Sequence, residues 1–502
     1  MKNNSRKAKC IAIFGTGSDV GKSVIATALC RYLVNKGLKV VPFKAQNMSN
    51  NSGVTPEGLE MGRAQIVQAE AACVSPHVDM NPILLKPTGD KGSQVVFKGK
   101  VLKDYTAKEY HVKKEMLFEK TVEALDKLRE NYDVVVIEGA GSCAEVNLMP
   151  HDIVNFRIAE YCDADVILAG DIHRGGIFAQ LKGTVDCISK AQQDMIKGFI
   201  INRFRGDVDL FKDGIDWIED KTDKKVFGVL PWYQDIKIES EDSVVIENPD
   251  SDKNNDFSKP SIAVIRTPHI SNFTDFEPLQ SIESINLAYI ENICDISKYK
   301  AVILPGSKNT RGDLKWLKNS GWADVLKEYS KTGAILGICG GYQLMGTIIH
   351  DPDGLEDKPG TSEGLSLLPI ETTLKSPKVT TVTDFSLNGS KSSGYEIHMG
   401  QTNINGGESF VKIEKRNGSD ENGFDGCSLN NGKIAGTYLH GFFDRPSIIK
   451  EWFDMVGIES SNLPETGGLP ARNLEYDKLS DYFEKHIDIS SMIELTDLKE
   501  IL

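Results

Sequence analysis

The stretch Ile11–Ser23, IAIFGTGSDVGKS, has the residue types of a loop that binds phosphate. An apolar run leads into glycines, and Gly21-Lys22-Ser23 stands directly before a helical pattern. Glycines allow backbone N–H groups to point inward at phosphate oxygens, and the helix adds its positive N-terminal end. The residues that this pattern assigns to ATP binding are Gly15, Thr16, Gly17, Gly21, Lys22 and Ser23.

The spacing of this loop departs from the usual phosphate-loop pattern by one residue. The usual pattern has its first glycine at the position of Thr16, whereas here the glycine lies one residue earlier, at Gly15. We expect Lys22 to reach the β- and γ-phosphates and the Ser23 hydroxyl to bind Mg²⁺. The alternative is an ordinary glycine-rich turn between a strand and a helix.

Further ligands for the metal ion are expected at the ends of other strands. Glu138 follows an apolar run in VVVIEGAG, and Asp171 follows another in ILAGDIHRGG. The carboxyl ends of strands form the edge at which open α/β sheets bind ligands, and Mg²⁺ prefers few carboxylates together with phosphates and water. We therefore predict Ser23, Glu138 and Asp171 as metal ligands. A solvated loop acid is the alternative for Glu138, and a cap of the following turn is the alternative for Asp171.

Polar residues after a neighbouring apolar run are assigned to the substrate. Lys44 comes directly after Phe43, and Gln46 and Asn47 lie in the loop that follows. A lysine there is suited to hold a carboxylate or a phosphate. We predict substrate contacts from Lys44, Gln46 and Asn47, with a simple surface position as the equal alternative for Lys44.

A second reactive group is expected at Cys339, in AILGICGGYQ. An apolar strand pattern ends at Ile338, and two glycines and a helical pattern follow the cysteine. This order is typical of a tight turn that lifts a nucleophile above a sheet, and a helix N-terminus favours the thiolate. The alternative is a buried structural cysteine, which we expect for most of the other eight.

The base that serves Cys339 has to come from a distant loop, and His440 in TYLHGFF follows a short apolar run. We predict that His440 takes the thiol proton and later protonates the leaving group. An oxyanion hole is predicted from the backbone N–H groups of Gly340 and of Gly306, the latter in the loop LPGSKNT. A histidine with no catalytic role is the alternative for His440.

The elements that position these residues follow from apolar patterns. Before residue 247, short apolar runs without polar alternation alternate with helical patterns, as in parallel sheets covered on both faces. The predicted strands are Cys10–Phe14, Lys39–Phe43, Val134–Ile137, Val166–Ala169 and Gly198–Ile201, and the predicted helices are Ser23–Asn35 and Lys108–Glu130. This alternation predicts a doubly wound α/β domain over residues 1–246.

The clearest break in the chain is the polar stretch ENPDSDKNNDFSKP, which predicts a linker over residues 247–260. The same alternation resumes over residues 261–448, the predicted second domain. Its predicted strands are Ile262–Arg266, Ala301–Leu304 and Ala334–Ile338, and its predicted helices are Trp322–Lys331 and Tyr342–Ile349. The region from Thr372 to Thr437 is predicted to be more antiparallel, because short alternating stretches are separated by Gly, Asn and Ser turns.

The C-terminal tail, residues 449–502, has a helical pattern. We expect it to pack on the second domain.

Composition narrows the class of protein. The 502 residues carry a net charge of −14, and 40% are apolar, which disfavours a nucleic-acid binder and fits a globular protein. The sequence has no apolar stretch long enough for a membrane span, and the short apolar run Cys10–Phe14 leads us to expect no signal peptide. The nine cysteines are scattered without a CxxC pair, which predicts reduced thiols in the cytoplasm.

Two motifs resemble known families. GICGGYQ, residues 337–343, resembles the nucleophile motif of class I glutamine amidotransferases, which hydrolyse glutamine through a thioester and have a flavodoxin-like α/β fold. The lengthened phosphate loop resembles that of dethiobiotin synthetase-like ATPases.

The common amidotransferase pattern places Glu two residues after the catalytic histidine, where this chain has Phe442. The orienting carboxylate is therefore absent or supplied elsewhere, and Glu396 in GYEIHMG is one candidate. This departure matches the cobyric/cobyrinic branch of the amidotransferases.

Longer runs resemble the cobyric acid synthase family over essentially the whole chain. These runs are PFKAQNMSNNS, GRAQIVQAEAA, MNPILLKP, EGAGSCAEVNL, DIHRGGIFAQLKGT, GFIINRFRGD and LPGSKNT. The resemblance implies amidation of the b, d, e and g carboxylates of adenosylcobyrinic acid a,c-diamide in cobalamin biosynthesis, with glutamine, ATP and Mg²⁺ as further reactants. The alternatives are the a,c-diamide synthase of the same pathway, and a regulatory P-loop ATPase with an inactive amidotransferase-like domain.

Overall fold

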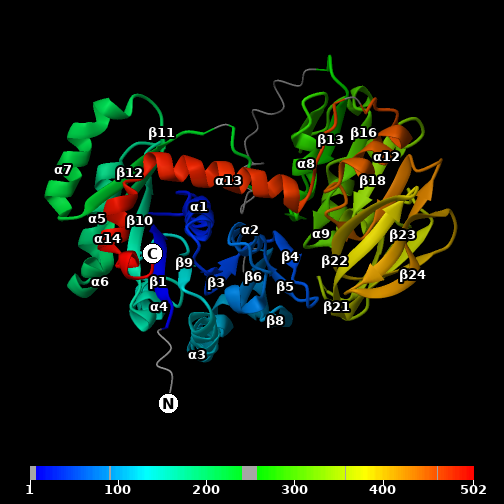
Figure 1. The fold of residues 1–502 in the computed structure, drawn as a ribbon. Coiled ribbons are helices and arrows are strands. Elements are labelled where there is room, and N and C mark those ends of the chain that lie inside the picture. Colours follow the sequence, from blue (N-terminus) through cyan, green and yellow to red (C-terminus); the bar gives the residue numbers. More distant parts are fainter. Residues whose placement is uncertain (1–6, 90–91, 234, 240–256, 357, 461) are drawn as a thin grey trace.

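The computed structural model describes residues 7–89, 92–233, 235–239, 257–356, 358–460 and 462–502. Most of the predicted linker, residues 247–260, lies outside these ranges. Two α/β domains lie on opposite sides of Figure 1, and each is built around its own large sheet. Within the described ranges, no helix has the length and apolar character required to cross a membrane.

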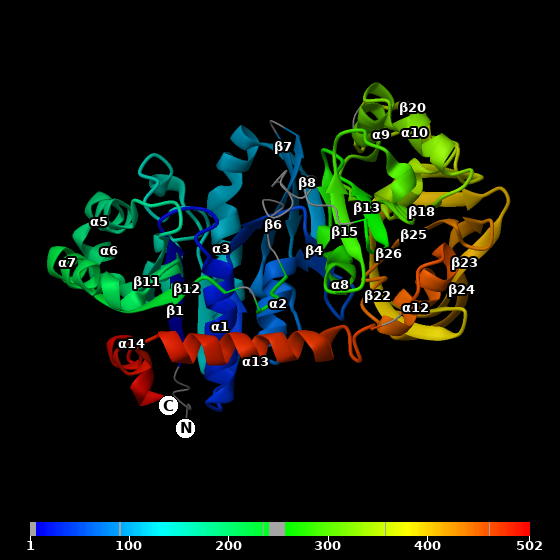
Figure 2. The same cartoon turned by 90° about the horizontal axis from the view of Figure 1, so that it is seen from above.

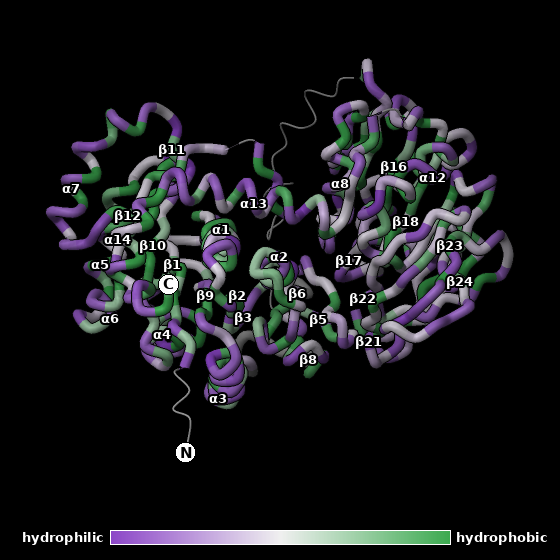
Figure 3. Tube along the Cα trace, in the orientation of Figure 1, coloured by the Kyte–Doolittle hydropathy of each residue, from purple (hydrophilic) through white to green (hydrophobic). Residues whose placement is uncertain are grey.

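The first domain contains six parallel strands in the order β12–β11–β10–β1–β9–β2. Their bounds are β1 Lys9–Gly15, β2 Val40–Phe43, β9 Val134–Glu138, β10 Asp165–Asp171, β11 Ile196–Phe204 and β12 Lys225–Pro231. The five predicted strands are confirmed, and β12 adds an edge strand. β1 and β10 are mostly green in the hydropathy colouring of Figure 3, whereas the outer helix α7 (Lys212–Thr222) is mostly purple.

Helices cover both faces of this sheet, and side chains from alternate positions of each strand enter two different cores. In β1, Ala12 and Phe14 pack into a core shared with α3 (Ala107–Asn131) and α4 (Phe156–Cys162), whereas Ile11 and Ile13 pack into a core shared with α1 (Lys22–Asn35). The other helices on the sheet are α5 (Ile177–Cys187) and α6 (Lys190–Met195). The doubly wound prediction is therefore confirmed.

A smaller layer of short strands lies between the two large sheets, as Figures 1 and 2 show. One sheet has the order β3–β6–β7–β8, with bounds Gln46–Met48, Ile83–Gly89, Gly92–Phe97 and Lys100–Thr106. A hairpin of β4 (Ser52–Val54) and β5 (Glu60–Gly62) lies beside it, and α2 (Arg63–Ala71) follows. This layer was not predicted from the sequence, and it brings the first domain into contact with the second.

The second domain has a mixed sheet with the path β15–β13–β16–β18–β25–β24–β23–β21–β19–β20. The parallel strands are β13 Ser261–Ile265, β15 Asn286–Ile290, β16 Ala301–Leu304, β18 Ala334–Ile338 and β25 Ile434–Thr437. The predicted antiparallel region is confirmed in β21 Ile370–Leu387, β22 Ser390–Ile404, β23 Glu408–Arg416 and β24 Ser419–Leu429. The helices α9 (Thr310–Asn319) and α10 (Trp322–Tyr329) pack against the parallel strands.

One helix prediction in this domain is wrong in its second half. The predicted helix Tyr342–Ile349 ends early, because α11 spans Gly340–Leu344 and β19 begins at Ile348 (Ile348–Asp351). A Cβ on Gly346 would lie 2.8 Å from the carbonyl oxygen of Ile370, so this glycine allows the chain to turn tightly against β21.

The prediction that the tail packs on the second domain holds only for its first helix. α12 (Pro446–Val456) packs on the second domain and crosses the predicted boundary at residue 448. α13 (Leu469–His486) and α14 (Ile489–Leu495) pack on the first domain instead, and Figure 2 shows α13 crossing α1. The apolar face of α13 (Tyr476, Leu479 and Phe483) has helical spacing and is buried there.

Candidate active sites

Cys339 lies at the turn between β18 and α11, with φ 51° and ψ −106°. This conformation is unusual for a residue with a side chain and is typical of a strained nucleophile turn. A Cβ on Gly341 would lie only 1.9 Å from the carbonyl oxygen of Leu304, so the turn after Cys339 requires glycine. The Cys339 side chain is 6% exposed.

His440 reaches Cys339 because β25 pairs in parallel with β18. The backbone N–H of Cys339 donates to the carbonyl oxygen of Thr437 at 2.8 Å, so both chains leave the sheet at one edge. The His440 imidazole is buried and lies near enough to the Cys339 sulfur for the sulfur to raise the pKa of His440. The structure thus brings together the nucleophile and the base that were predicted 101 residues apart in the sequence.

The carboxylate that orients His440 is Asp275, which sequence reasoning missed. Asp275 lies in the 3₁₀ turn Phe273–Phe276, its Oδ2 atom is 2.7 Å from His440 Nδ1, and its Oδ1 atom accepts from the Gly441 N–H at 2.9 Å. Glu396, the candidate from the sequence, accepts instead from Thr383 and Arg416, each at 2.8 Å. No sequence signal marks Asp275, because it lies far from both catalytic motifs along the chain.

The charges around His440 favour an imidazolium. Burial alone would lower the pKa of His440, but the Asp275 carboxylate and the Cys339 sulfur outweigh burial and raise this pKa to about 10. Imidazolium next to thiolate is the ion pair that a nucleophilic cysteine uses. The buried triad therefore has the geometry and the charge for nucleophilic attack on an acyl carbon.

The loops predicted to form the oxyanion hole also meet at this point. A Cβ on Gly306 would lie 3.2 Å from His440 Cε1, and a Cβ on Gly340 would lie 2.6 Å from the Ser307 backbone nitrogen. Both glycines therefore lie against the catalytic pair. Their backbone N–H groups as the oxyanion donors stay a prediction.

We expect Asp275→Asn to lower glutamine hydrolysis by about 10²-fold, because an asparagine amide cannot hold the imidazolium as a carboxylate does. The variant also removes a negative charge, so the pKa of His440 falls and the alkaline limb of the pH–rate profile moves to lower pH. Glu396→Gln is the matched control and should keep the wild-type profile. Steady-state glutamate formation, measured across pH, gives both the rate and the pH profile of each variant. Equal losses of rate in Asp275→Asn and Glu396→Gln would assign no orienting role to Asp275.

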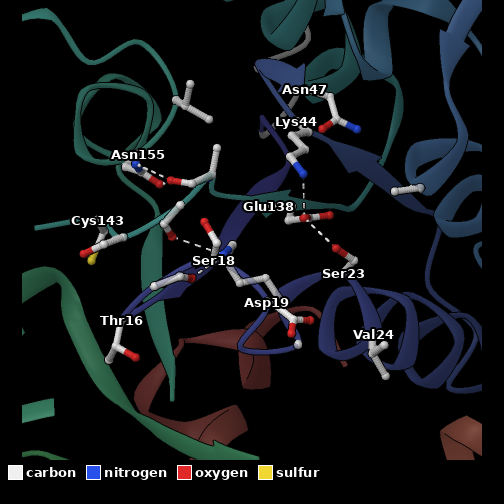
Figure 4. Close-up of a pocket in the computed structure, with 18 of the residues that line it drawn as sticks. Thr16, Ser18, Asp19, Ser23, Val24, Lys44, Asn47, Glu138, Cys143 and Asn155 are labelled. Carbon is white, nitrogen blue, oxygen red and sulfur yellow. Dashed lines mark hydrogen bonds and ion pairs between the residues drawn. The ribbon is translucent and has the colours of Figure 1, made fainter. Parts of the chain in front are cut away.

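The phosphate loop of the first domain is shown in Figure 4. The Lys22 ammonium donates to the carbonyl oxygens of Gly17 at 2.8 Å and Gly141 at 3.1 Å, so it lies across the loop. Gly21, the residue before α1, has φ 95°, and a Cβ there would lie 2.1 Å from Asn202 Nδ2. The predicted residues Gly17, Gly21, Lys22 and Ser23 line one cavity, as does Thr16. Gly15 is the exception and lies below the loop at the end of β1.

Glu138 and Ser23 form the centre of this site. The Ser23 hydroxyl and the Lys44 ammonium each lie 2.8 Å from Glu138 Oε1, as the dashed lines in Figure 4 show. Glu138 is fully buried, and its Oε2 atom accepts from Gln65 at 3.3 Å and from Gln68. A serine hydroxyl beside one carboxylate is a donor set that Mg²⁺ accepts when phosphates and water complete the shell. The residues present therefore fit a nucleotide-bound magnesium ion.

Gln65 and Gln68 were missed as functional residues. Both side chains reach Glu138 from α2, and their spacing of three places them on one face of that helix. This spacing in GRAQIVQAEAA is a signal that the sequence does contain.

Asp171 lies at the end of β10, but its contacts differ from those predicted. Its Oδ2 atom accepts from Arg203 at 3.0 Å, and its Oδ1 atom accepts from the His173 N–H at 2.7 Å. It caps a turn and pairs with an arginine, and it is not among the residues that line the cavity. The structure brings Ser23 and Glu138 together without Asp171, whose role as a metal ligand stays a prediction.

The cavity over the phosphate loop measures about 1200 Å³. The predicted substrate contacts Lys44, Gln46 and Asn47 all line it. Gln46 accepts from the Tyr110 hydroxyl, and Asn47 donates to Gln65 Oε1 at 2.9 Å. The cavity exceeds the usual range for a single small ligand, about 300–1,000 Å³. It therefore has room for a nucleotide and a second ligand.

Comparisons with known proteins match both halves of the chain. Residues 11–245 match the CobQ/CobB/MinD/ParA nucleotide binding domain, and residues 261–448 match the CobB/CobQ-like glutamine amidotransferase domain. The cobyric acid synthase of Chlorobium phaeobacteroides is 46% identical, with 99% of this chain and 98% of that protein covered. This chain belongs to the cobyric acid synthase family. The cobyric acid synthases of Chlorobaculum tepidum and Vibrio vulnificus are 47% and 42% identical over 97% and 96% of this chain, and 98% and 99% of their own lengths.

Membership of the cobyric acid synthase family confirms the predicted architecture, a P-loop nucleotide-binding domain followed by a glutamine amidotransferase domain. One solved structure, a glutamine amidotransferase, is 17% identical and covers 39% of this chain and 99% of its own, with a TM-score of 0.31.

Proposed function

We propose that this chain amidates the b, d, e and g carboxylates of adenosylcobyrinic acid a,c-diamide, with glutamine as the nitrogen source and ATP as the source of energy. The observation that carries the proposal is the presence of two separate clusters of reactive side chains on one chain. One is the Cys339–His440–Asp275 triad, and the other is the phosphate loop with the Ser23–Glu138 pair. Identity to cobyric acid synthases of 41–48% over nearly the full chain supports the choice of substrate.

In the second domain, the Cys339 thiolate attacks the side-chain amide carbon of glutamine. His440, as imidazolium, gives its proton to the departing nitrogen, and ammonia leaves while a thioester remains on Cys339. Water, activated by the now neutral His440, then hydrolyses the thioester to glutamate. Asp275 holds Nδ1 of His440 throughout, so that Nε2 faces the sulfur.

In the first domain, a substrate carboxylate takes the γ-phosphoryl group of ATP and becomes an acyl phosphate. Ammonia from the second domain attacks the acyl carbon, phosphate leaves, and an amide results. Lys22 reaches the β- and γ-phosphates. The Ser23 hydroxyl and Glu138 would hold Mg²⁺, which would supply charge neutralisation at the transferring phosphate. A free ammonium ion cannot attack, since it has no lone pair, so the amide nitrogen has to arrive as ammonia.

The corrinoid is assigned to the part of the cavity beyond the phosphate loop. Lys44 lines the same cavity and its ammonium lies 2.8 Å from Glu138 Oε1, where a lysine favours the approach of a substrate carboxylate to the γ-phosphate. Contacts from Lys44, Gln46 and Asn47 to substrate, and a cytoplasmic location, stay predictions.

The test is to incubate the purified protein with glutamine, Mg²⁺-ATP and adenosylcobyrinic acid a,c-diamide, and to follow the corrinoid by mass spectrometry. We expect successive replacements of acid by amide, with glutamate and ADP formed in step. Reactions that lack Mg²⁺ or ATP serve as controls and should give no amide. An unchanged corrinoid in the presence of an intact glutaminase activity would disprove the proposed substrate.

A further inference from the structure

Ser52, in the hairpin of the first domain, makes direct contacts with the second domain. Its backbone carbonyl oxygen accepts hydrogen bonds from Asn272 Nδ2 at 2.9 Å and from the Tyr395 hydroxyl at 3.2 Å. The same Asn272 amide nitrogen also donates to the Tyr395 hydroxyl at 3.1 Å. A neighbouring contact joins Asn51 Oδ1 and the Thr274 hydroxyl at 3.1 Å.

Asn272 and Tyr395 both touch the surroundings of the catalytic histidine. Asn272 has φ 51°, is buried, and directly precedes the 3₁₀ turn that carries Asp275. The Tyr395 ring stacks on the His440 imidazole, with ring centroids 5.3 Å apart and an interplanar angle of 20°. The residue that stacks on the imidazole and the residue that precedes the turn of Asp275 are therefore tied to one backbone oxygen of the other domain.

Ser52 is itself held by a buried group of charges. Lys86 Nζ lies 2.7 Å from both the Ser52 hydroxyl and Glu60 Oε1, and the hydroxyl donates to the same carboxylate oxygen at 3.0 Å. Lys378, from β21 of the second domain, completes the group with a 2.8 Å contact to Glu60 Oε2. The Lys86–Glu60–Lys378 group thus holds Ser52 in place. Because Lys378 belongs to the second domain, the same group also joins the two domains.

Burial makes this group sensitive to the contact between the domains. The Glu60 side chain is fully shielded from solvent, and those of Lys86 and Lys378 are 4% and 8% exposed. Burial alone would raise the pKa of Glu60, but the two lysines outweigh burial and lower it, so the carboxylate stays charged. Separation of the domains would remove Lys378 from the buried Glu60 carboxylate. Because a buried charge without its partner raises the free energy, this separation is unfavourable.

We propose that Asn272 and Tyr395 are positioning residues for the catalytic histidine, and that Ser52 of the first domain holds them in place. On this view the second domain hydrolyses glutamine efficiently only while the first domain is docked, which limits ammonia release to the assembled enzyme. The inference rests on the proposed function, because it assigns roles in the glutaminase half of that reaction. None of these residues is expected to touch ATP or the corrinoid.

Two variants remove the contacts to Ser52 with little change in shape. Asn272→Gly keeps the left-handed backbone and deletes the amide, whereas Tyr395→Phe keeps the ring stacking and deletes the hydroxyl. We expect each to lower kcat for glutamine-dependent synthesis by about tenfold or more, because each deletes at least two of these hydrogen bonds, with a smaller change in KM for glutamine. Ammonia-dependent synthesis should keep its wild-type rate.

Asn431→Gly is the matched control, because Asn431 also has a left-handed backbone, with φ 56°, but lies exposed in a turn of the second domain. It should match the wild type in both assays. A second readout is the pH profile of glutamine hydrolysis, which should change in Asn272→Gly and Tyr395→Phe because the imidazole is no longer held. A purely structural role would lower both nitrogen-source activities together and leave the pH profile unchanged.

The role of Ser52 in holding Asn272 and Tyr395 is tested with Lys378→Met. This variant removes one contact to Glu60 and leaves Glu60 paired with Lys86 and Ser52. We expect a smaller loss of glutamine-dependent synthesis, rescued by Lys378→Arg. Because Lys378 and Asn272 act through the same Ser52, the double variant should lose less than the product of the two single losses. Multiplicative losses would show that the two residues act independently, and would overturn the route through Ser52.

Failure of this inference can be separated from failure of the proposed function. If the wild type forms amides and Asn272→Gly and Tyr395→Phe behave like Asn431→Gly, the positioning role is wrong while the activity stands. If the wild type forms no amide from either nitrogen source, the proposed function itself fails, whereas glutamate formation by the same variants still tests the positioning role.

Discussion

With Cys339 replaced by alanine, we expect glutamine-dependent amide formation to fall by about 10⁴-fold or more, to below detection. The thioester route has no other nucleophile, so removal of the sulfur removes the reaction rather than slowing one step. Ammonia-dependent synthesis should persist at the wild-type rate, since the phosphate loop and its cavity lie in the other domain. The measurement is corrinoid amide formed with glutamine and, separately, with an ammonium salt.

Two features make Cys339→Ala a clean test. Alanine keeps the Cβ atom, so the strained backbone at φ 51° is no more strained than before. The matched control is Cys427→Ala, because Cys427 is another buried cysteine of the same core but lies apart from His440, with its sulfur against the Gly406 carbonyl oxygen. Cys427→Ala should keep glutamine use. If Cys339→Ala still makes amide from glutamine, Cys339 is not the nucleophile.

The complementary result is expected for Lys22→Ala, which should lower synthesis from both nitrogen sources by about 10³-fold. Lys22 already lies across the phosphate loop in contact with Gly17 and Gly141, and its charge is needed at the β- and γ-phosphates as the acyl phosphate forms. Glutamine hydrolysis should survive, because the triad is untouched. Rates of ADP, amide and glutamate formation, measured in parallel, separate these effects.

The matched control for Lys22 is Lys36→Ala, at the opposite end of the same helix. Lys36 is exposed and pairs with Glu484 of α13 at 2.8 Å, an interaction of small energetic weight. It should leave all three rates unchanged. Normal ammonia-dependent synthesis in Lys22→Ala would rule out the phosphate loop as the site of carboxylate activation.

The strands and both reactive motifs could be predicted because their signals are local. Each of the predicted parallel strands is buried on both faces over its central residues, so it reads as an apolar run, and each motif follows such a run directly. The helix prediction from Tyr342 to Ile349 failed at Gly346, where apolar residues on both sides hid the turn. Apolar content alone does not separate a short half-buried strand such as β19 from the end of a helix.

The carboxylate that completes the triad could not be predicted, although the sequence does show that the usual glutamate after His440 is missing. Phe442 occupies the usual position of the carboxylate and is buried. The sequence suggested Glu396 as a replacement, and nothing in it marked Asp275. Only the strand order decides between them, since it directs Glu396 toward Arg416 and brings Asp275 to His440.

The sequence by itself determined the local units of this protein: the phosphate loop between β1 and α1, the nucleophile turn after β18, the two α/β halves and the family. The tertiary structure decided which distant residues complete each unit, namely Asp275 at His440, Gln65 and Gln68 at Glu138, and Ser52 beneath Tyr395. The physical reason is that motifs record short-range backbone geometry, whereas these contacts depend on strand order and domain docking. The spacing of Gln65 and Gln68 marks one face of a helix, but no spacing in the sequence relates that face to Glu138, or Asp275 to His440.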